Sequence, residues 1–86
     1  MYIICTYDVE DIRCNKVMKI CRQYLFHVQE SVFEGTLTPH KFNCLKKDLN
    51  KIIHKEDSVH FYISFDEKQF QKEYIGKPDI ETNIIE

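Results

Sequence analysis

The chain has 86 residues, a formal net charge of −2 and 43% hydrophobic residues, a composition that indicates one folded domain and excludes an intrinsically disordered chain. The charge is uneven, because residues 1–55 carry nine Lys/Arg and six Asp/Glu whereas residues 56–86 carry three and eight. The overall charge therefore argues against general nucleic-acid binding but allows a local basic surface that contacts phosphate.

The cysteines and the N-terminus indicate a reduced cytoplasmic protein. The four cysteines form no C-x-x-C pair and no paired spacing typical of zinc ligands; they are Cys5, Cys14, Cys21 and Cys44. The apolar run at the N-terminus has no basic region before it and is too short to span a membrane. We therefore expect no membrane association.

The first predicted element is a strand from Tyr2 to Val9. Both of its faces are largely apolar, which is typical of a central strand covered on both sides. Asp8 closes this strand and shares a face with Ile4 and Thr6. A desolvated carboxylate needs a hydrogen-bond donor, a cation or a metal, so Asp8 is the first candidate functional residue. The alternative is a helix cap or Asx turn, which is the commoner use of such an aspartate.

Two helices are predicted. The first runs from Asp11 or Arg13 to Leu25, with an apolar stripe at helical spacing formed by Val17, Ile20, Cys21 and Tyr24. The second begins at Thr38-Pro39, a hydroxyl cap followed by proline, and runs to Ile53 or His54. A strand over Val28 to Phe33, closed by Glu34-Gly35, is expected between the helices, with a bend or turn at the glycine and a second strand or extended segment after it.

Two further strands complete the prediction. Residues Ser58 to Phe65 alternate as a half-buried strand does, and a last short strand is expected at Glu73 to Ile75. The element order predicts an α+β fold, a ferredoxin-like β-α-β-β-α-β sandwich. We expect one domain over residues 1–77, followed by a tail over residues 78–86.

In this fold both helices cover one face of the sheet, and the other face needs a partner. The apolar first strand, Phe33 and Tyr62 favour a second copy packed sheet against sheet. Two Asp8 carboxylates would then approach each other across the two-fold axis. All-oxygen ligation of this kind suits Mg²⁺ or Mn²⁺, which could activate water for hydrolysis of a phosphodiester.

Several other side chains are candidates for nucleic-acid contact, although packing, helix capping or solvation is the commoner explanation of each. Phe33 could stack on a base, and His27 could transfer a proton or bind phosphate. Basic side chains that could hold a phosphate backbone are Arg13, Lys16, Lys46, Lys47 and Lys51.

Five short matches, spread over the chain up to Lys77, carry a resemblance to a known family. They are Tyr7-Asp8-Val9, Arg13 with Asn15-Lys16-Val17, Val28-Gln29-Glu30-Ser31-Val32-Phe33-Glu34-Gly35, Asp57-Ser58-Val59 and Ile75-Gly76. The run from Val28 to Gly35 is the most specific. The chain thereby resembles the small CRISPR-associated endoribonuclease of spacer acquisition, number two in the Cas series.

The resemblance implies a ferredoxin-like homodimer in which an extra C-terminal strand is exchanged between subunits. It implies that Asp8 binds Mg²⁺ at the dimer interface, and that Tyr7, Asp8 and Phe33 form the catalytic site of an endonuclease for single-stranded RNA or double-stranded DNA. It also implies a scaffold that holds double-stranded prespacer DNA in a complex with the CRISPR spacer integrase, with the hydrophobic end of the tail as a docking segment.

Two positions depart from the family pattern. Cys14 and His27 stand where many members have Arg, and this removes guanidinium groups that would hold phosphate. Lys16 keeps the expected positive charge, and Arg13 is expected to compensate for Cys14. Two alternatives stay open: a nucleic-acid-binding scaffold without relevant catalysis, and a ribonuclease toxin of the same fold.

Overall fold

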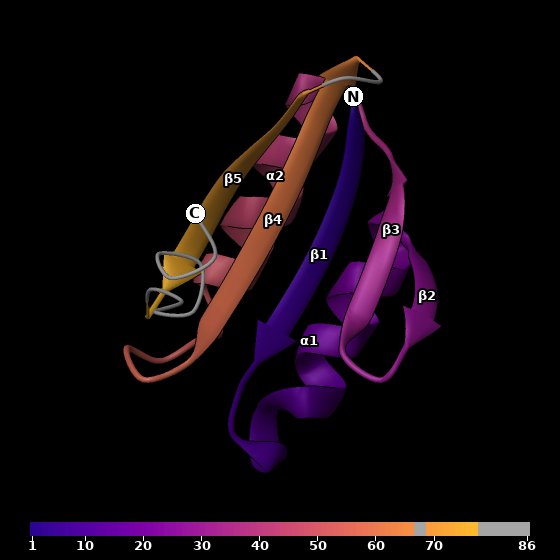
Figure 1. Ribbon diagram of the computed structural model, residues 1–86. Helices are drawn as coiled ribbons and strands as arrows, with labels where there is room; N and C mark the ends of the chain where they lie inside the picture. The colour runs from indigo at the N-terminus through magenta and orange to yellow at the C-terminus, as the bar shows by residue number, and fades with distance from the viewer. Residues whose placement is uncertain (67–68, 78–86) are drawn as a thin grey trace.

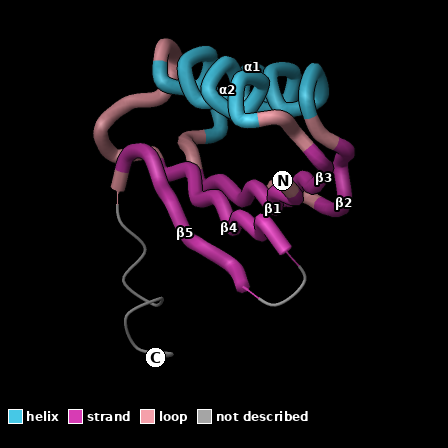
Figure 2. The backbone as a smooth tube through the Cα atoms, turned by 90° about the horizontal axis from the view of Figure 1, so that it is seen from above, coloured by secondary structure: helices cyan, strands magenta, loops and turns pink. Residues whose placement is uncertain are grey.

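The computed structural model describes residues 1–66 and 69–77. The chain forms β1 (Tyr2–Asp8), α1 (Asp11–Tyr24), β2 (Phe26–Gln29), β3 (Val32–Thr36), α2 (Pro39–Asn50), β4 (Ser58–Asp66) and β5 (Gln69–Gly76). The strands make one antiparallel sheet in the order β2-β3-β1-β4-β5 (Figure 1). Both helices lie on the same side of the sheet (Figure 2). The predicted α+β, ferredoxin-like architecture is confirmed.

The central strand β1 separates the two faces of the sheet. Ile3, Cys5 and Tyr7 are buried beneath the helices, whereas Ile4 and Thr6 are half-buried on the opposite side. We call this second side, which no helix of the described residues covers, the open face. The core on the helix side also contains buried side chains of both helices, namely Val17, Cys21, Phe42, Leu45 and Leu49.

The region after α1 has two strands between the helices, as the predicted element order requires, but the run from Val28 to Phe33 is not one strand as predicted. The chain instead forms a hairpin, in which β2 and β3 pair antiparallel around Glu30 and Ser31. Glu30 has a φ of 36°, the left-handed conformation that reverses the chain there. Gly35 lies within β3 and does not end it. A glycine suits this position because a Cβ would come within 3.1 Å of the Leu25 side chain.

The second helix begins as predicted and ends earlier. The hydroxyl of Thr38 accepts a hydrogen bond from the backbone N–H of Lys41 at 3.1 Å, and Pro39 occupies the first turn. The helix ends at Asn50, and the N–H of Ile52 bonds to the carbonyl of Leu49 three residues back, which tightens the turn that follows.

The last strand is longer than predicted and pairs with β4 of the same chain along its length. Exchange of this strand between two chains stays a prediction. The tail over residues 78–86 lies outside the described residues. Of the helices that are described, none has the length and apolar character needed to cross a membrane.

Candidate functional site

Asp8 lies at the exposed end of β1, on the open face. Its backbone is held by the β1–β4 ladder, where its register partner is Ser58. Asp8 lines a polar pocket of about 410 Å³ with Val9, Glu10, Arg13, Glu56 and Asp57. As predicted, Asp8 closes the first strand, and the alternating burial along β1 places it on the same face as Ile4 and Thr6. It does not cap α1, whose first turn carries Asp11.

One chain supplies Asp8 as a single carboxylate for a metal. Within residues 1–66 and 69–77, no three His, Cys, Asp or Glu side chains come together in a way that could hold a metal ion. Mg²⁺ commonly binds through one or two carboxylates and keeps several water ligands. An exposed Asp8 from each of two chains fits this donor set.

Arg13 does not occupy the phosphate-binding position expected from the sequence. The side chain is only 11% exposed and forms a two-point ion pair with Asp57. Its Nε donates to Oδ2 of Asp57 at 2.6 Å, and its Nη2 donates to Oδ1 at 2.9 Å. A third bond, from Nη2 to Glu10, measures 3.2 Å. A guanidinium used in this way does not compensate for Cys14, which is half-buried beside the carbonyl of Val9.

Asp57 is the residue that sequence reasoning overlooked as part of the site. It is 2% exposed, and its carboxylate also accepts hydrogen bonds from the backbone N–H groups of Glu10 and His54. The hydrogen bonds from Arg13 are the largest cause that holds the pKa of Asp57 well below its usual range, and the two backbone amides add to the effect. The sequence signal that could have identified Asp57 is its place directly before an alternating strand, within the segment Asp57-Ser58-Val59.

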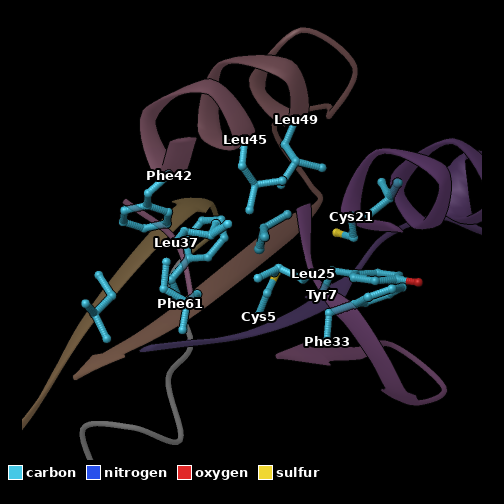
Figure 3. Close-up of a cluster of buried hydrophobic side chains, with 14 residues drawn as sticks. Cys5, Tyr7, Cys21, Leu25, Phe33, Leu37, Phe42, Leu45, Leu49 and Phe61 are labelled. Carbon is cyan, nitrogen blue, oxygen red and sulfur yellow. The ribbon is translucent and has the colours of Figure 1, made fainter. Parts of the chain in front are cut away.

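Tyr7 and Phe33 lie on the helix side of the sheet, opposite to Asp8. Figure 3 shows their rings side by side near Cys21, and their centroids are 6.2 Å apart. Burial raises the pKa of the Tyr7 hydroxyl. Phe33 has no exposed surface, so the expectation that it lies on the open face and stacks on a base is wrong for this structure. Any catalytic contribution of these two rings would be indirect, through the position of β1.

His27 lies on the edge strand β2 and is exposed. Its ring stacks on Phe33 at 4.6 Å between centroids, and its Nε2 lies 2.7 Å from the carbonyl oxygen of Glu30. The ring therefore packs locally and bonds within the hairpin turn. It is accessible to a ligand, but it does not lie on the open face with Asp8, because its register partner is Phe33.

The predicted phosphate-binding lysines lie on the helices. Lys16 on α1 and Lys47 on α2 are exposed, as is Lys51 at the end of α2. Lys46 differs, because its Nζ lies 3.0 Å from Glu73 on β5 and 4.3 Å from the ring centroid of Phe42. The helices that carry these lysines lie on the side of the sheet opposite to the open face (Figure 2).

Comparison with known proteins extends the resemblance. A family model described as CRISPR associated protein Cas2 matches residues 1–73. A protein of Thermotoga maritima named CRISPR-associated endoribonuclease Cas2 is 47% identical over 86 residues, 99% of each chain. One of Thermodesulfovibrio yellowstonii, CRISPR-associated endoribonuclease Cas2 3, is 43% identical over 86 residues, 98% of each chain. The crystal structure of Streptococcus pyogenes Cas2 at pH 6.5 matches with a TM-score of 0.69 and 38% identity, covering 74% of this chain and 86% of that chain.

Proposed function

Because the chain belongs to the Cas2 family of CRISPR-associated proteins, we propose that it is a metal-dependent endonuclease of CRISPR adaptation, active as a homodimer. The observation that supports this is the placement of Asp8 at the exposed end of a central strand, on the face that the helices leave open. The names of the relatives favour this function over the ribonuclease toxin of the same fold.

In this proposal Asp8 of each chain holds one Mg²⁺ or Mn²⁺ between two open faces. A divalent ion bound there would supply an activated water and neutralise charge on the phosphodiester. The β1–β4 ladder fixes the backbone of Asp8 opposite Ser58. Ile4, which is half-buried on the same face of β1 as Asp8, would be covered by the second chain.

A nuclease assay tests the proposal. Purified protein of measured oligomeric mass is incubated with single-stranded RNA or duplex DNA in Mg²⁺, Mn²⁺ or EDTA. We expect cleavage only with metal, and its loss in Asp8→Ala. Glu56→Ala is the matched control, since Glu56 is another exposed carboxylate of the same pocket and should retain cleavage. Equal metal-dependent cleavage by wild type and Asp8→Ala would refute the assignment.

A second function, as a scaffold for double-stranded prespacer DNA beside the spacer integrase, is favoured by a separate observation. The exposed lysines Lys16, Lys47 and Lys51 form no ion pair within residues 1–66 and 69–77, whereas Lys46 pairs with Glu73. Neutralising Lys47 and Lys51 to Gln should weaken duplex binding. It should also reduce the slope of the salt dependence, by about one unit for each phosphate that a lysine no longer neutralises. Asp8→Ala should bind duplex as wild type does, and binding that is insensitive to salt and to both lysines would contradict the scaffold.

A further inference from the structure

The carboxylate of Asp57 joins three parts of the chain at the pocket that Asp57 lines together with Asp8. Oδ1 accepts hydrogen bonds from the N–H of Glu10 at 3.2 Å and from Arg13 Nη2 at 2.9 Å. Oδ2 accepts from Arg13 Nε at 2.6 Å and from the N–H of His54 at 2.9 Å. The loop after β1, the first turn of α1 and the loop before β4 are therefore bound to one buried side chain.

The same residue fixes the end of β5 through its main chain. The N–H of Lys77 donates to the carbonyl of Asp57 at 2.8 Å. Gly76 lies so close to this carbonyl that a Cβ would overlap it, and its φ of 87° suits glycine. Asp57 thus holds β5 with its backbone and the β1–α1 loop with its side chain.

These contacts hold the chain at two places near Asp8, namely the strand beside it and the loop that follows it. Ser58, the register partner of Asp8, directly follows Asp57 in the chain. Glu10, whose N–H is bound by Asp57, comes two residues after Asp8. The Asp8 carboxylate lies exposed at the strand end, so its direction depends on the backbone at the end of β1.

We infer that Asp57, together with Arg13, is a positioning residue that holds the end of β1 so that Asp8 presents its carboxylate to the metal in one orientation. This rests on the metal site of the proposed function. Residues that orient metal ligands indirectly typically change metal affinity or activity by about 10- to 100-fold when they are altered. A purely structural role would change stability without a selective effect on the metal.

The test compares Mn²⁺ affinity, from the electron paramagnetic resonance of free Mn²⁺, in full-length variants at a temperature where all are folded. Asp57→Asn replaces one acceptor oxygen with an amide that cannot accept, so at least two of the four hydrogen bonds are lost. Arg13→Lys keeps the charge but cannot form the two-point pair, and it carries the test if Asp57→Asn does not fold. Leu45→Ala is the control for stability, since Leu45 is fully buried on α2 and contributes nothing to the pocket.

We expect Mn²⁺ affinity to fall about tenfold or more in Asp57→Asn, and in the same direction in Arg13→Lys, with wild-type affinity in Leu45→Ala. In cleavage, kcat should fall in the Asp57 and Arg13 variants while KM stays near the wild-type value. Wild-type Mn²⁺ affinity in both variants, with affinity lost in Asp8→Ala, would overturn this inference and leave the metal site standing. Equal Mn²⁺ binding by wild type and Asp8→Ala would overturn both.

Discussion

Replacing Arg13 by methionine should destabilise the fold more than any exposed charge change in the chain. The substitution leaves the Asp57 carboxylate, only 3% exposed, without its cation. Breaking a buried ion pair by removing one partner costs about 3–5 kcal/mol. The backbone N–H groups of Glu10 and His54 still bind the carboxylate, so we expect the lower end, about 3 kcal/mol. That is a large part of the stability of a small domain.

The pH dependence of the stability loss in Arg13→Met identifies the ion pair with Asp57 as the cause of that loss. Because the pKa of Asp57 is lowered in the folded state, its contribution to stability is present above the ordinary carboxyl pKa of about 3.9 and is lost as pH falls below it. In Arg13→Met the buried carboxylate has no guanidinium, so protonation relieves part of its cost. The difference in unfolding free energy between wild type and Arg13→Met should therefore be largest near neutral pH and shrink below about pH 4.

Urea unfolding followed by circular dichroism, at one protein concentration and a series of pH values, measures this difference. The protein concentration is fixed because association of the proposed homodimer would add to the measured stability. The matched control is Lys46→Met, which removes a lysine from the partly exposed pair with Glu73 and should cost at most about 1 kcal/mol. The reasoning is refuted if Arg13→Met costs no more than Lys46→Met, or if the cost of Arg13→Met is the same at pH 7 and pH 3.

Three further substitutions probe other parts of the structure. Phe33→Ala should lower unfolding free energy by about 3–5 kcal/mol, because Phe33 is fully buried; lost cleavage at unchanged stability would instead support direct contact with substrate. Gly76→Ala should destabilise by at least about 1 kcal/mol in the same urea assay, since its Cβ would overlap the Asp57 carbonyl, and an unchanged midpoint would contradict the close contact. The hydrogen bond to Asp48 raises the pKa of Tyr24 to about 12, so its contribution to stability is lost as pH rises from 10 to 12. Tyr24→Phe should remove this alkaline loss and the matching tyrosine absorbance step, and a step that persists would assign it to another tyrosine.

Much of the fold was predictable because its signals are local. The apolar period of α1, the Thr38-Pro39 start of α2 and the alternation of β4 each depend on neighbours in the sequence, and each element is present. The turn between β2 and β3 was misplaced at Glu34-Gly35, because the turn residues are Glu30 and Ser31 rather than the Asn or Gly that usually mark such turns. Gly35 was misread for a related reason, since it serves close packing against Leu25 and not a turn.

The candidate site was predictable only where it depends on strand alternation. The place of Asp8 follows from the period of two along β1. The burial of Arg13 does not, because its partner Asp57 is 44 residues away in sequence and the pair forms only when β4 lies beside β1. Which side of the sheet Phe33 occupies depends on its pairing with Cys5 in the β1–β3 ladder, and the misplaced turn left that pairing unpredicted.

The arrangement of the two groups of candidate residues bears on how one small chain serves both proposed functions. Asp8 lies on the open face, where a second copy would cover it, whereas Lys47 and Lys51 lie along α2 on the opposite side of the sheet. A duplex that follows the α2 lysines of one chain therefore lies on the side of the sheet away from the Asp8 of that chain. Holding DNA and hydrolysing a phosphodiester would then use separate surfaces of the chain.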